Sequence, residues 1–178
     1  MKVILYMAMT ANGLIAKEDD DVWFVSKNSW KSFEKLMKKC GNMIIGRRTY
    51  EISVKDGTFP YSCFNVVMTK QKIENKWGDK VVFTNKKPEE VLRFLKKKGF
   101  KTAFIGGGGT LNASFMKEGL VDEIYLDVEP VVLGKGIRLF ADSDFEAKLR
   151  FIEIKKLSKN EVQLHYKVVK QLFRHKQN

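Results

Sequence analysis

The sequence contains few of the residues on which several protein classes depend. Its 178 residues include only 2 cysteines, 2 histidines and 3 prolines. Cys40 and Cys63 have no neighbours at the spacing of a metal site, so no metal centre is expected. Two thiols without such a pattern are typical of reduced, structural cysteines, which predicts a cytoplasmic protein.

Long apolar segments are also missing. The apolar runs are far shorter than the ~20 residues needed to cross a bilayer, so no membrane helix is expected. The opening MKVILYMAM resembles a short signal peptide, but its length and composition favour a buried strand. The length predicts one domain, which we place at residues 1–170, followed by a frayed tail at 171–178.

Acidic residues are outnumbered by basic ones. The chain has 33 Lys and Arg against 21 Asp and Glu, a net charge of +12. Such a balance would suit nucleic-acid binding, but the lysines are dispersed and are not interleaved with aromatic residues as in a single-strand platform. A solvated basic surface, or a field that attracts a small anion, fits this distribution better.

Buried strands alternate with amphipathic helices along the chain. Continuous apolar runs predict the strands, and apolar stripes that end at glycine predict the helices. The predicted strands are 3–9, 43–45, 65–69, 81–83, 102–105 and 124–128, with helices at 29–40, 88–98 and 111–118. Segments 150–157 and 162–169 read as a closing hairpin. This order predicts an α/β sandwich around a mostly parallel sheet with an antiparallel C-terminal end.

Four consecutive glycines, Gly106–Gly109, join a predicted strand to a predicted helix. The unpaired amides of a helix start and the helix dipole attract anions, and glycine lets a pyrophosphate approach the backbone. The spacing is not that of a Rossmann fingerprint, and the Gly-Lys-Ser/Thr of a P-loop is absent. A tight strand–helix connection without any ligand is the alternative.

A second cluster, Gly46-Arg47-Arg48-Thr49, follows another apolar strand. Two guanidinium groups and a hydroxyl at a helix start suit a phosphate monoester, and Thr69-Lys70 would add a hydroxyl and a cation. Two anion sites at the carboxyl ends of neighbouring strands suit a dinucleotide that carries an extra phosphate.

Five segments in this order resemble the dihydrofolate-reductase-like family: TANGLIA (10–16), IIGRRTYE (44–51), NVVMTK (65–70), FIGGGGTLNASFM (104–116) and VDEIYLDVEPVVLGKG (121–136). The resemblance covers essentially the whole domain. The second half is most similar to the reductase domain of bifunctional riboflavin-biosynthesis deaminase-reductases, and the first half to small dihydrofolate-reductase-like proteins. The resemblance implies a dihydrofolate-reductase-like three-layer sandwich and an NADPH-dependent reductase.

The resemblance also implies where the cofactor binds. The glycine turn would hold the pyrophosphate, the arginine cluster the adenosine-side phosphates, Thr69 and Lys70 the 2′-phosphate, and the first strand and following loop the nicotinamide. The implied residues are Ala8, Ile15, Ala16, Gly46, Arg47, Arg48, Thr49, Thr69, Lys70, Ile105, Gly106, Gly107, Gly108, Gly109 and Thr110. The acidic loop 16–22 resembles the mobile active-site loop of the family, although a solvated acidic turn is an equal alternative.

The catalytic residues of the relatives are not all matched. Dihydrofolate reductases carry a carboxylate on the first helix, where this chain has Asn28 or Ser29. The acidic, proline-containing pattern of the riboflavin-pathway reductases is missing from segment 52–60. Asp127 and Glu129 alternate on a predicted strand and share one face, although solvation of an edge strand would explain them equally well. The catalytic candidates are Asn28, Ser29 and Asp127.

The sequence therefore predicts a reductase that transfers hydride from NADPH to a small heterocyclic or carbonyl substrate. The alternatives are the 5-amino-6-(5-phosphoribosylamino)uracil reductase of riboflavin biosynthesis, a dihydrofolate reductase, and a non-catalytic nucleotide-binding protein. The expected partners are a small-molecule substrate and a second copy of the chain, with no nucleic acid and no membrane.

Overall fold

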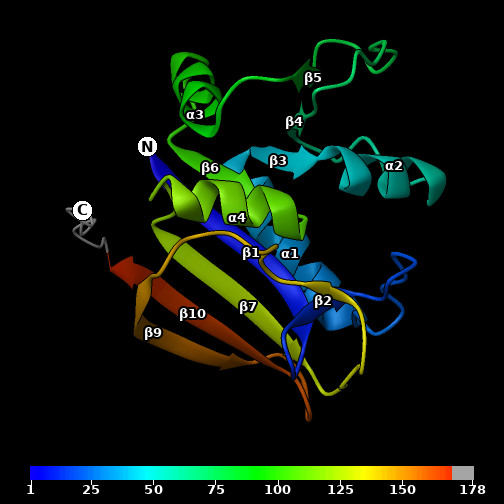
Figure 1. Ribbon diagram of the computed structural model, residues 1–178, viewed down its shortest axis with the longest axis vertical. Coiled ribbons are helices and arrows are strands. Elements are labelled where there is room, and N and C mark those ends of the chain that lie inside the picture. Colours follow the sequence, from blue (N-terminus) through cyan, green and yellow to red (C-terminus); the bar gives the residue numbers. More distant parts are fainter. Residues whose placement is uncertain (170–178) are drawn as a thin grey trace.

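The computed structural model describes residues 1–169, and the predicted tail at 171–178 lies outside the described residues. Its main feature is an eight-stranded sheet in the order β5-β4-β3-β6-β1-β7-β10-β9 (Figure 1). These strands are β1 (Lys2–Thr10), β3 (Asn42–Gly46), β4 (Phe64–Met68), β5 (Val81–Thr84), β6 (Thr102–Ile105), β7 (Glu123–Glu129), β9 (Lys148–Lys156) and β10 (Val162–Val169). The pairs from β5 to β7 are parallel, and β10 pairs antiparallel with both β7 and β9.

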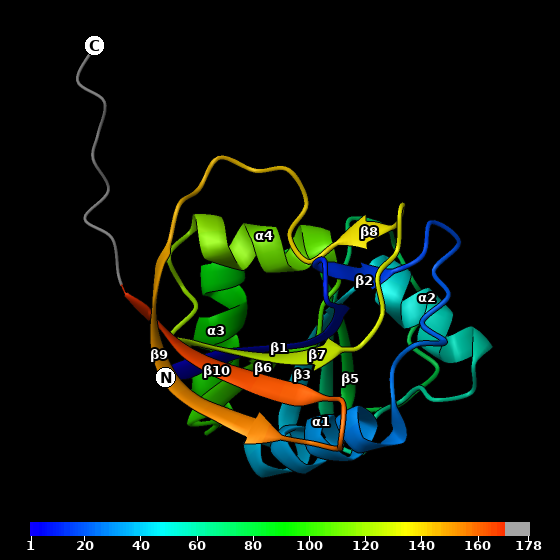
Figure 2. The same cartoon turned by 90° about the horizontal axis from the view of Figure 1, so that it is seen from below.

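Helices cover both faces of this sheet, which gives three layers (Figure 2). One face carries α3 (Pro88–Lys97) and α4 (Gly109–Lys117), and the other carries α1 (Lys27–Cys40). The fourth helix, α2 (Arg47–Lys55), follows β3 directly. Within residues 1–169, none of the helices combines the length and apolar character needed to span a bilayer. The predicted α/β sandwich with a mostly parallel sheet and an antiparallel end is confirmed.

The first strand shows why the sheet is covered twice. Successive side chains of a strand point to opposite faces, and β1 is apolar on both. Val3 and Leu5 pack into the core beneath α3 and α4, while Ile4 and Tyr6 pack into the core beneath α1. The prediction that MKVILYMAM forms a buried strand is therefore confirmed.

Two of the helices begin at a glycine N-cap. Helix α1 starts conventionally, because Ser26 accepts a hydrogen bond from the amide of Ser29 at 3.0 Å. The N-caps of α2 and α4 are Gly46 and Gly108, which have no side chain to cap the helix. The first amides of both helices are thus left for a ligand or for solvent.

Two short strands were not predicted from the sequence. β2 (Leu14–Ala16) and β8 (Ile137–Arg138) pair antiparallel in a separate small sheet. Strands of three and two residues are too short to produce a recognisable period in the sequence. The segment before β8 passes very close to the backbone of β2. A Cβ at Gly136 would lie 2.4 Å from the carbonyl oxygen of Ala16, so only glycine fits there.

The position of β7 corrects one interpretation of its acidic residues. This strand lies between β1 and β10, so it is not an edge strand. Asp127 and Glu129 are each only 1% exposed, and solvation of an edge therefore does not explain them. The edge strand at this end of the sheet is β9, where Phe151 and Ile154 are each 56% exposed.

Candidate functional site

A cavity of about 970 Å³ lies at the carboxyl ends of β1, β3, β4, β5 and β6. In a parallel sheet, the loops after the strands meet at this end, which is where ligands of α/β proteins bind. The volume lies at the upper end of the ~300–1,000 Å³ range of small-molecule sites. The cavity extends from the α4 side of the sheet to the α1 side. Its lining differs along this direction, and we call its two parts the cationic half and the aromatic half.

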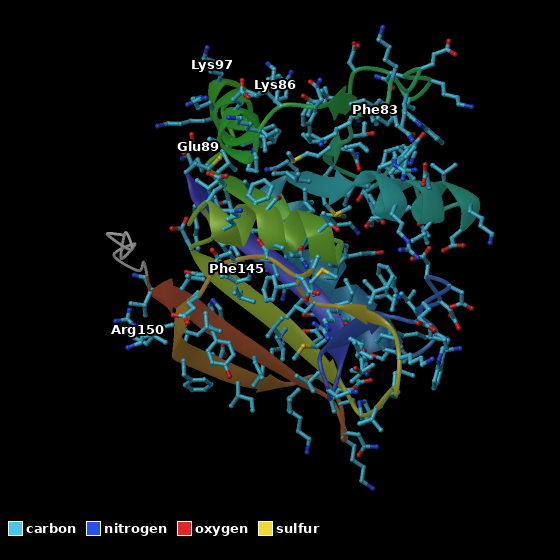
Figure 3. The ribbon with its side chains drawn as sticks, in the orientation of Figure 1. Phe83, Lys86, Glu89, Lys97, Phe145 and Arg150 are labelled. Atoms are coloured by element: carbon cyan, nitrogen blue, oxygen red, sulfur yellow. The ribbon has the colours of Figure 1, made fainter. Side chains whose placement is uncertain are left out.

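The cationic half is defined by five basic side chains: Arg47, Arg48, Lys70, Lys86 and Arg138. They come from the start of α2, the ends of β4 and β5, and β8; Lys86 is labelled in Figure 3. The uncapped N-termini of α2 and α4 line the same half. Positive side chains and free helix amides together favour an extended polyanion.

Arg48 also binds the acidic loop that follows β2. The Nε of Arg48 lies 2.6 Å from an oxygen of Asp20, and its Nη2 donates to the carbonyl of Glu18 at 3.1 Å. Asp20 adopts a left-handed backbone conformation, with φ of +72°. Asp20 thus pairs with Arg48, while its neighbours Glu18 and Asp19 are exposed; the mobile active-site loop and the solvated acidic turn both stay predictions.

The first half of the glycine turn is required by packing within the protein. A Cβ at Gly106 would lie 2.9 Å from the sulfur of Met43 on β3. Gly107 has φ of +93°, and a Cβ there would lie 2.8 Å from the sulfur of Met7 on β1. These two glycines let the turn fit against neighbouring strands, whether or not a ligand is present.

The second half of the turn differs, because one of its glycines has room for a side chain. A Cβ at Gly109 would lie 2.5 Å from the carbonyl oxygen of Arg138, again a packing requirement. A Cβ at Gly108 would have ordinary contacts, the nearest being the hydroxyl oxygen of Thr49 at 3.5 Å. The free surface of Gly108 lines the cavity at the start of α4, beside the start of α2.

The aromatic half lies between α1 and the segment that follows α2. Its apolar walls are Val25, Trp30, Phe33, Ile52 and Tyr61. Its polar lining residues are Ser29, Ser53, Asp56 and Thr58. An apolar wall with a few fixed polar groups is typical of a site for a flat organic molecule.

A buried carboxylate lies behind Ser29. Asp127 accepts hydrogen bonds from Tyr6 Oη at 2.5 Å, from Ser29 Oγ at 2.7 Å and from Gln163 Nε2 at 2.7 Å. Burial raises the pKa of Asp127 above its ordinary value, although these three hydrogen bonds act in the opposite direction. Ser29 and Tyr6 line the cavity, so the carboxylate acts on the cavity through their hydroxyl groups.

Glu129 holds the beginning of α1 from the same strand. Its carboxylate accepts a hydrogen bond from the backbone amide of Ser26, the N-cap of α1, at 2.9 Å. Burial raises its pKa, opposed by this hydrogen bond. Asp127 and Glu129 thus both attach β7 to the first turn of α1, which fixes the position of Ser29.

Most of the predicted cofactor residues line the cavity. These are Ala8, Ile15, Ala16, Gly46, Arg47, Arg48, Thr49, Thr69, Lys70, Gly106, Gly108, Gly109 and Thr110. Ile105 is fully buried in the core beneath α4, and Gly107 packs against Met7, so neither contributes lining.

The three catalytic candidates lie in different places. Ser29 lines the cavity, and Asp127 lies directly behind it. Asn28 is exposed and is not part of the lining. Neighbouring positions on a helix face different directions, so only one of Asn28 and Ser29 can point into the site.

Several lining residues were not identified from the sequence. The main ones are Tyr6, Trp30, Phe33, Ile52, Ser53, Asp56, Thr58, Tyr61, Lys86, Arg138 and Asp142. Most belong to no motif, and they meet only because the topology brings α1, α2 and β8 around the same strand ends. A basic residue after each of two neighbouring strands was the available signal for Lys86, by analogy with Lys70. Among residues 1–169, no set of three or more His, Cys, Asp or Glu side chains is arranged to hold a metal ion.

Comparisons with known proteins agree with this architecture. The family described as "RibD C-terminal domain" matches residues 1–163. The "Uncharacterized protein YwjB" of Bacillus subtilis (strain 168) is 33% identical over 172 residues, covering 93% of this chain and 97% of the relative.

Solved structures are similar over nearly the whole chain. The "Putative riboflavin biosynthesis protein" from Shewanella sp. PV-4 is 26% identical with a TM-score of 0.84, covering 95% of this chain and 99% of its own. A dihydrofolate reductase from Enterococcus faecalis, complexed with NADP(H), has a TM-score of 0.70 at 19% identity, covering 94% of this chain and 96% of its own. The second likeness shows a shared fold, and both agree with the sequence resemblance.

Proposed function

The chain belongs to the RibD C-terminal domain family, a family of reductase-like domains, and from this premise we propose that it is an NADPH-dependent reductase. Its substrate is a small heterocyclic or carbonyl compound. When bound, NADPH supplies the hydride, and the protein supplies binding, orientation and electrostatics.

The observation that carries this proposal is the pair of uncapped helix starts in the cationic half. Gly46 and Gly108 begin α2 and α4 beside the same cavity, and neither helix has a side-chain cap. One diphosphate can accept hydrogen bonds from both sets of amides. Lys70 and Lys86 lie at the ends of adjacent strands, where they would pair with a further phosphate.

The opposite half of the cavity would hold the substrate. Trp30 and Phe33 provide flat apolar surfaces, and Ser29 provides a polar contact that Asp127 keeps in one orientation. Asp127 is therefore a positioning residue in this proposal. Asn28 takes no part, because it is exposed outside the cavity.

A second candidate within the same reaction class is the 5-amino-6-(5-phosphoribosylamino)uracil reductase step of riboflavin biosynthesis. The family match favours it. Reduction of dihydrofolate is less well supported, since the first helix offers Ser29 where that reaction uses a carboxylate. A nucleotide-binding protein without catalytic activity would share the cationic half but would show no turnover.

Two measurements test the proposal. Titration with NADPH should quench tryptophan fluorescence, because Trp30 lines the cavity. NADPH absorbance should then decrease in the presence of a pterin, the ribosylaminouracil phosphate or a simple carbonyl compound. A protein that binds no NADPH would contradict the proposal, whereas binding without turnover of any of these substrates would favour the non-catalytic alternative.

We also infer that two copies of the chain associate through β9. This edge strand exposes Leu149, Phe151 and Ile154, which share one face of the sheet opposite β10. An exposed apolar edge favours pairing with a second edge, and a two-fold dimer places the same patch of both copies in contact. Light scattering should give the mass of a dimer for the unaltered protein and of a monomer for Phe151→Lys. A monomer in both cases would refute the inference.

A further inference from the structure

Charged side chains are divided unevenly between the two halves of the cavity. The cationic half has five lining Lys and Arg side chains against two lining carboxylates, Asp20 and Asp142, which pair with Arg48 and Arg138. The aromatic half instead carries Asp56, an exposed residue at the end of α2. A phosphate or carboxylate bound in the aromatic half would therefore face a negative charge, with no lining cation there to neutralise it.

The hydroxyl groups of the aromatic half donate their protons to acceptors within the protein. Ser29 donates its only hydroxyl proton to the carboxylate of Asp127 at 2.7 Å. Thr58 donates its hydroxyl proton to the carbonyl of Ser53 at 3.2 Å. A hydroxyl whose proton is used inside the protein offers only oxygen lone pairs to a ligand.

Tyr61 follows the same rule. Ser53 Oγ donates to the carbonyl of Thr49 at 2.8 Å, which uses its single proton. The contact of 2.6 Å between Ser53 Oγ and Tyr61 Oη therefore requires Tyr61 to be the donor. Tyr61 also lines the cavity, which leaves its oxygen as an acceptor once its proton is used.

From these contacts, we propose that the aromatic half selects a flat heterocycle that presents N–H donors and carries neither phosphate nor carboxylate. This inference rests on the proposed function, in which the cationic half binds the cofactor. Ser29, Thr58 and Tyr61 accept hydrogen bonds from the N–H groups of the ring, Trp30 and Phe33 pack against its faces, and Asp56 repels anionic substituents. The substrate is thus a neutral or cationic amino-heterocycle, distinct from a sugar phosphate or a folate with its glutamate tail.

The test compares matched pairs of probes that differ in an anionic group. The pairs are dihydrobiopterin and dihydrofolate, pyridoxamine and pyridoxamine phosphate, and cytidine and cytidine monophosphate. Affinities are measured by calorimetry with saturating NADP⁺, which keeps anionic probes out of the cationic half. At least one member without the anion should bind about 10-fold more tightly than its anionic partner, as expected for a like-charge contact at the rim of a site.

A charge reversal sharpens the test. Asp56→Lys should reduce that preference several-fold, while Glu118→Lys, the same change on an exposed residue outside the cavity lining, should leave it unchanged. Equal or tighter binding of the anionic probes, failure of every non-anionic probe, or a preference unaffected by Asp56→Lys would each overturn the inference. NADPH affinity, measured separately by fluorescence, would fail only if the proposed function itself were wrong.

Discussion

The cationic half and the aromatic half of the cavity differ in where their polar groups come from. In the cationic half, backbone amides at two helix starts supply the hydrogen bonds, and they need only glycine at Gly46 and Gly108. In the aromatic half, side chains supply them, and each hydroxyl is oriented by another group of the protein. Recognition by backbone amides depends little on the sequence and suits a ligand that related proteins share. Recognition by side chains can differ among related proteins that bind different substrates.

The largest expected effect concerns the group that orients the aromatic half. Asp127→Asn replaces an acceptor of three hydrogen bonds by an amide whose nitrogen must face one of the same donors. Ser29 then loses the partner that orients its hydroxyl toward the substrate, and the loss of ~1–3 kcal/mol of transition-state stabilisation should lower kcat/KM by up to about 100-fold. Steady-state kinetics on a substrate found by the NADPH screen would measure it, with the exposed carboxylate variant Asp144→Asn as control.

If the decrease came only from a damaged fold, NADPH affinity in the cationic half would fall as well. We expect instead that NADPH binding remains within about 3-fold of the unaltered protein, since local changes at separate sites usually act independently. A Ser29→Ala variant should reproduce part of the loss, because Ser29 is the link between Asp127 and the cavity. Loss of NADPH affinity in both variants would show that the halves are not independent.

The pH dependence follows from the same carboxylate. Burial raises the pKa of Asp127 above its ordinary 3.8. As the pH falls through the raised pKa, the carboxylate gains a proton and stops accepting from Ser29, so kcat/KM should decrease on the acid side. Stability has the opposite sign: the folded state binds this proton more tightly than the unfolded chain, so the contribution of Asp127 to stability decreases as the pH rises through the raised pKa. The acid limb of the kcat/KM profile should be missing in Asp127→Asn.

The next effect tests the cationic half alone. Gly108 has φ of −84°, and the Cβ that Gly108→Val introduces meets only ordinary contacts. Its methyl groups would occupy the space beside the first amides of α4. Loss of two charge-assisted hydrogen bonds predicts an affinity for NADPH about 100-fold lower.

A matched substitution separates this effect from loss of flexibility. Gly134→Val adds the same side chain where nothing lies within 4 Å, and it should leave NADPH affinity unchanged. Circular dichroism and the melting temperature of each variant show that it is folded before its NADPH affinity is compared. Normal NADPH binding by a folded Gly108→Val protein would show that the glycine turn serves packing alone.

The same comparison explains how far the sequence could predict the site. The cationic half was largely predictable, because glycine and arginine in Gly46–Thr49 and Gly106–Gly109 are contiguous and follow apolar strands. Even there, the sequence could not separate glycines required by packing, such as Gly107 against Met7, from Gly108, which has room for a side chain. That distinction depends on which neighbour approaches each position.

The aromatic half was mostly not predictable. Its residues in segment 52–61 match no motif, and their roles depend on hydrogen bonds to distant parts of the chain or to the backbone. Asp127 was recognisable as a candidate, but its burial followed only from the placement of β7 between β1 and β10. The alternation of strands and helices fixed the layers, while the two-residue strand β8 left no period to detect.

The smallest expected effect concerns the choice between NADPH and NADH. The guanidinium groups of Arg47 and Arg48 already lie 2.6 Å from Glu51 and Asp20. A phosphate that recruits them must compete with these carboxylates, which reduces what either arginine adds to binding. Lys70 follows β4 and lines the cavity at the end of the sheet, and no competing ion pair of its ammonium group is present among the described residues.

We therefore expect Lys70 to contribute most of the discrimination. One charge-assisted hydrogen bond is worth ~1.5–3 kcal/mol, so NADPH should bind at least ~10-fold more tightly than NADH. Lys70→Ala should remove most of this ratio by weakening NADPH and leaving NADH almost unchanged, because only NADPH carries the 2′-phosphate. Lys80→Ala, which removes an exposed lysine outside the cavity, controls for the change in net charge. Equal affinities of the unaltered protein for the two cofactors, measured by fluorescence titration at one ionic strength, would remove the 2′-phosphate from this site and leave the cationic half with a diphosphate alone.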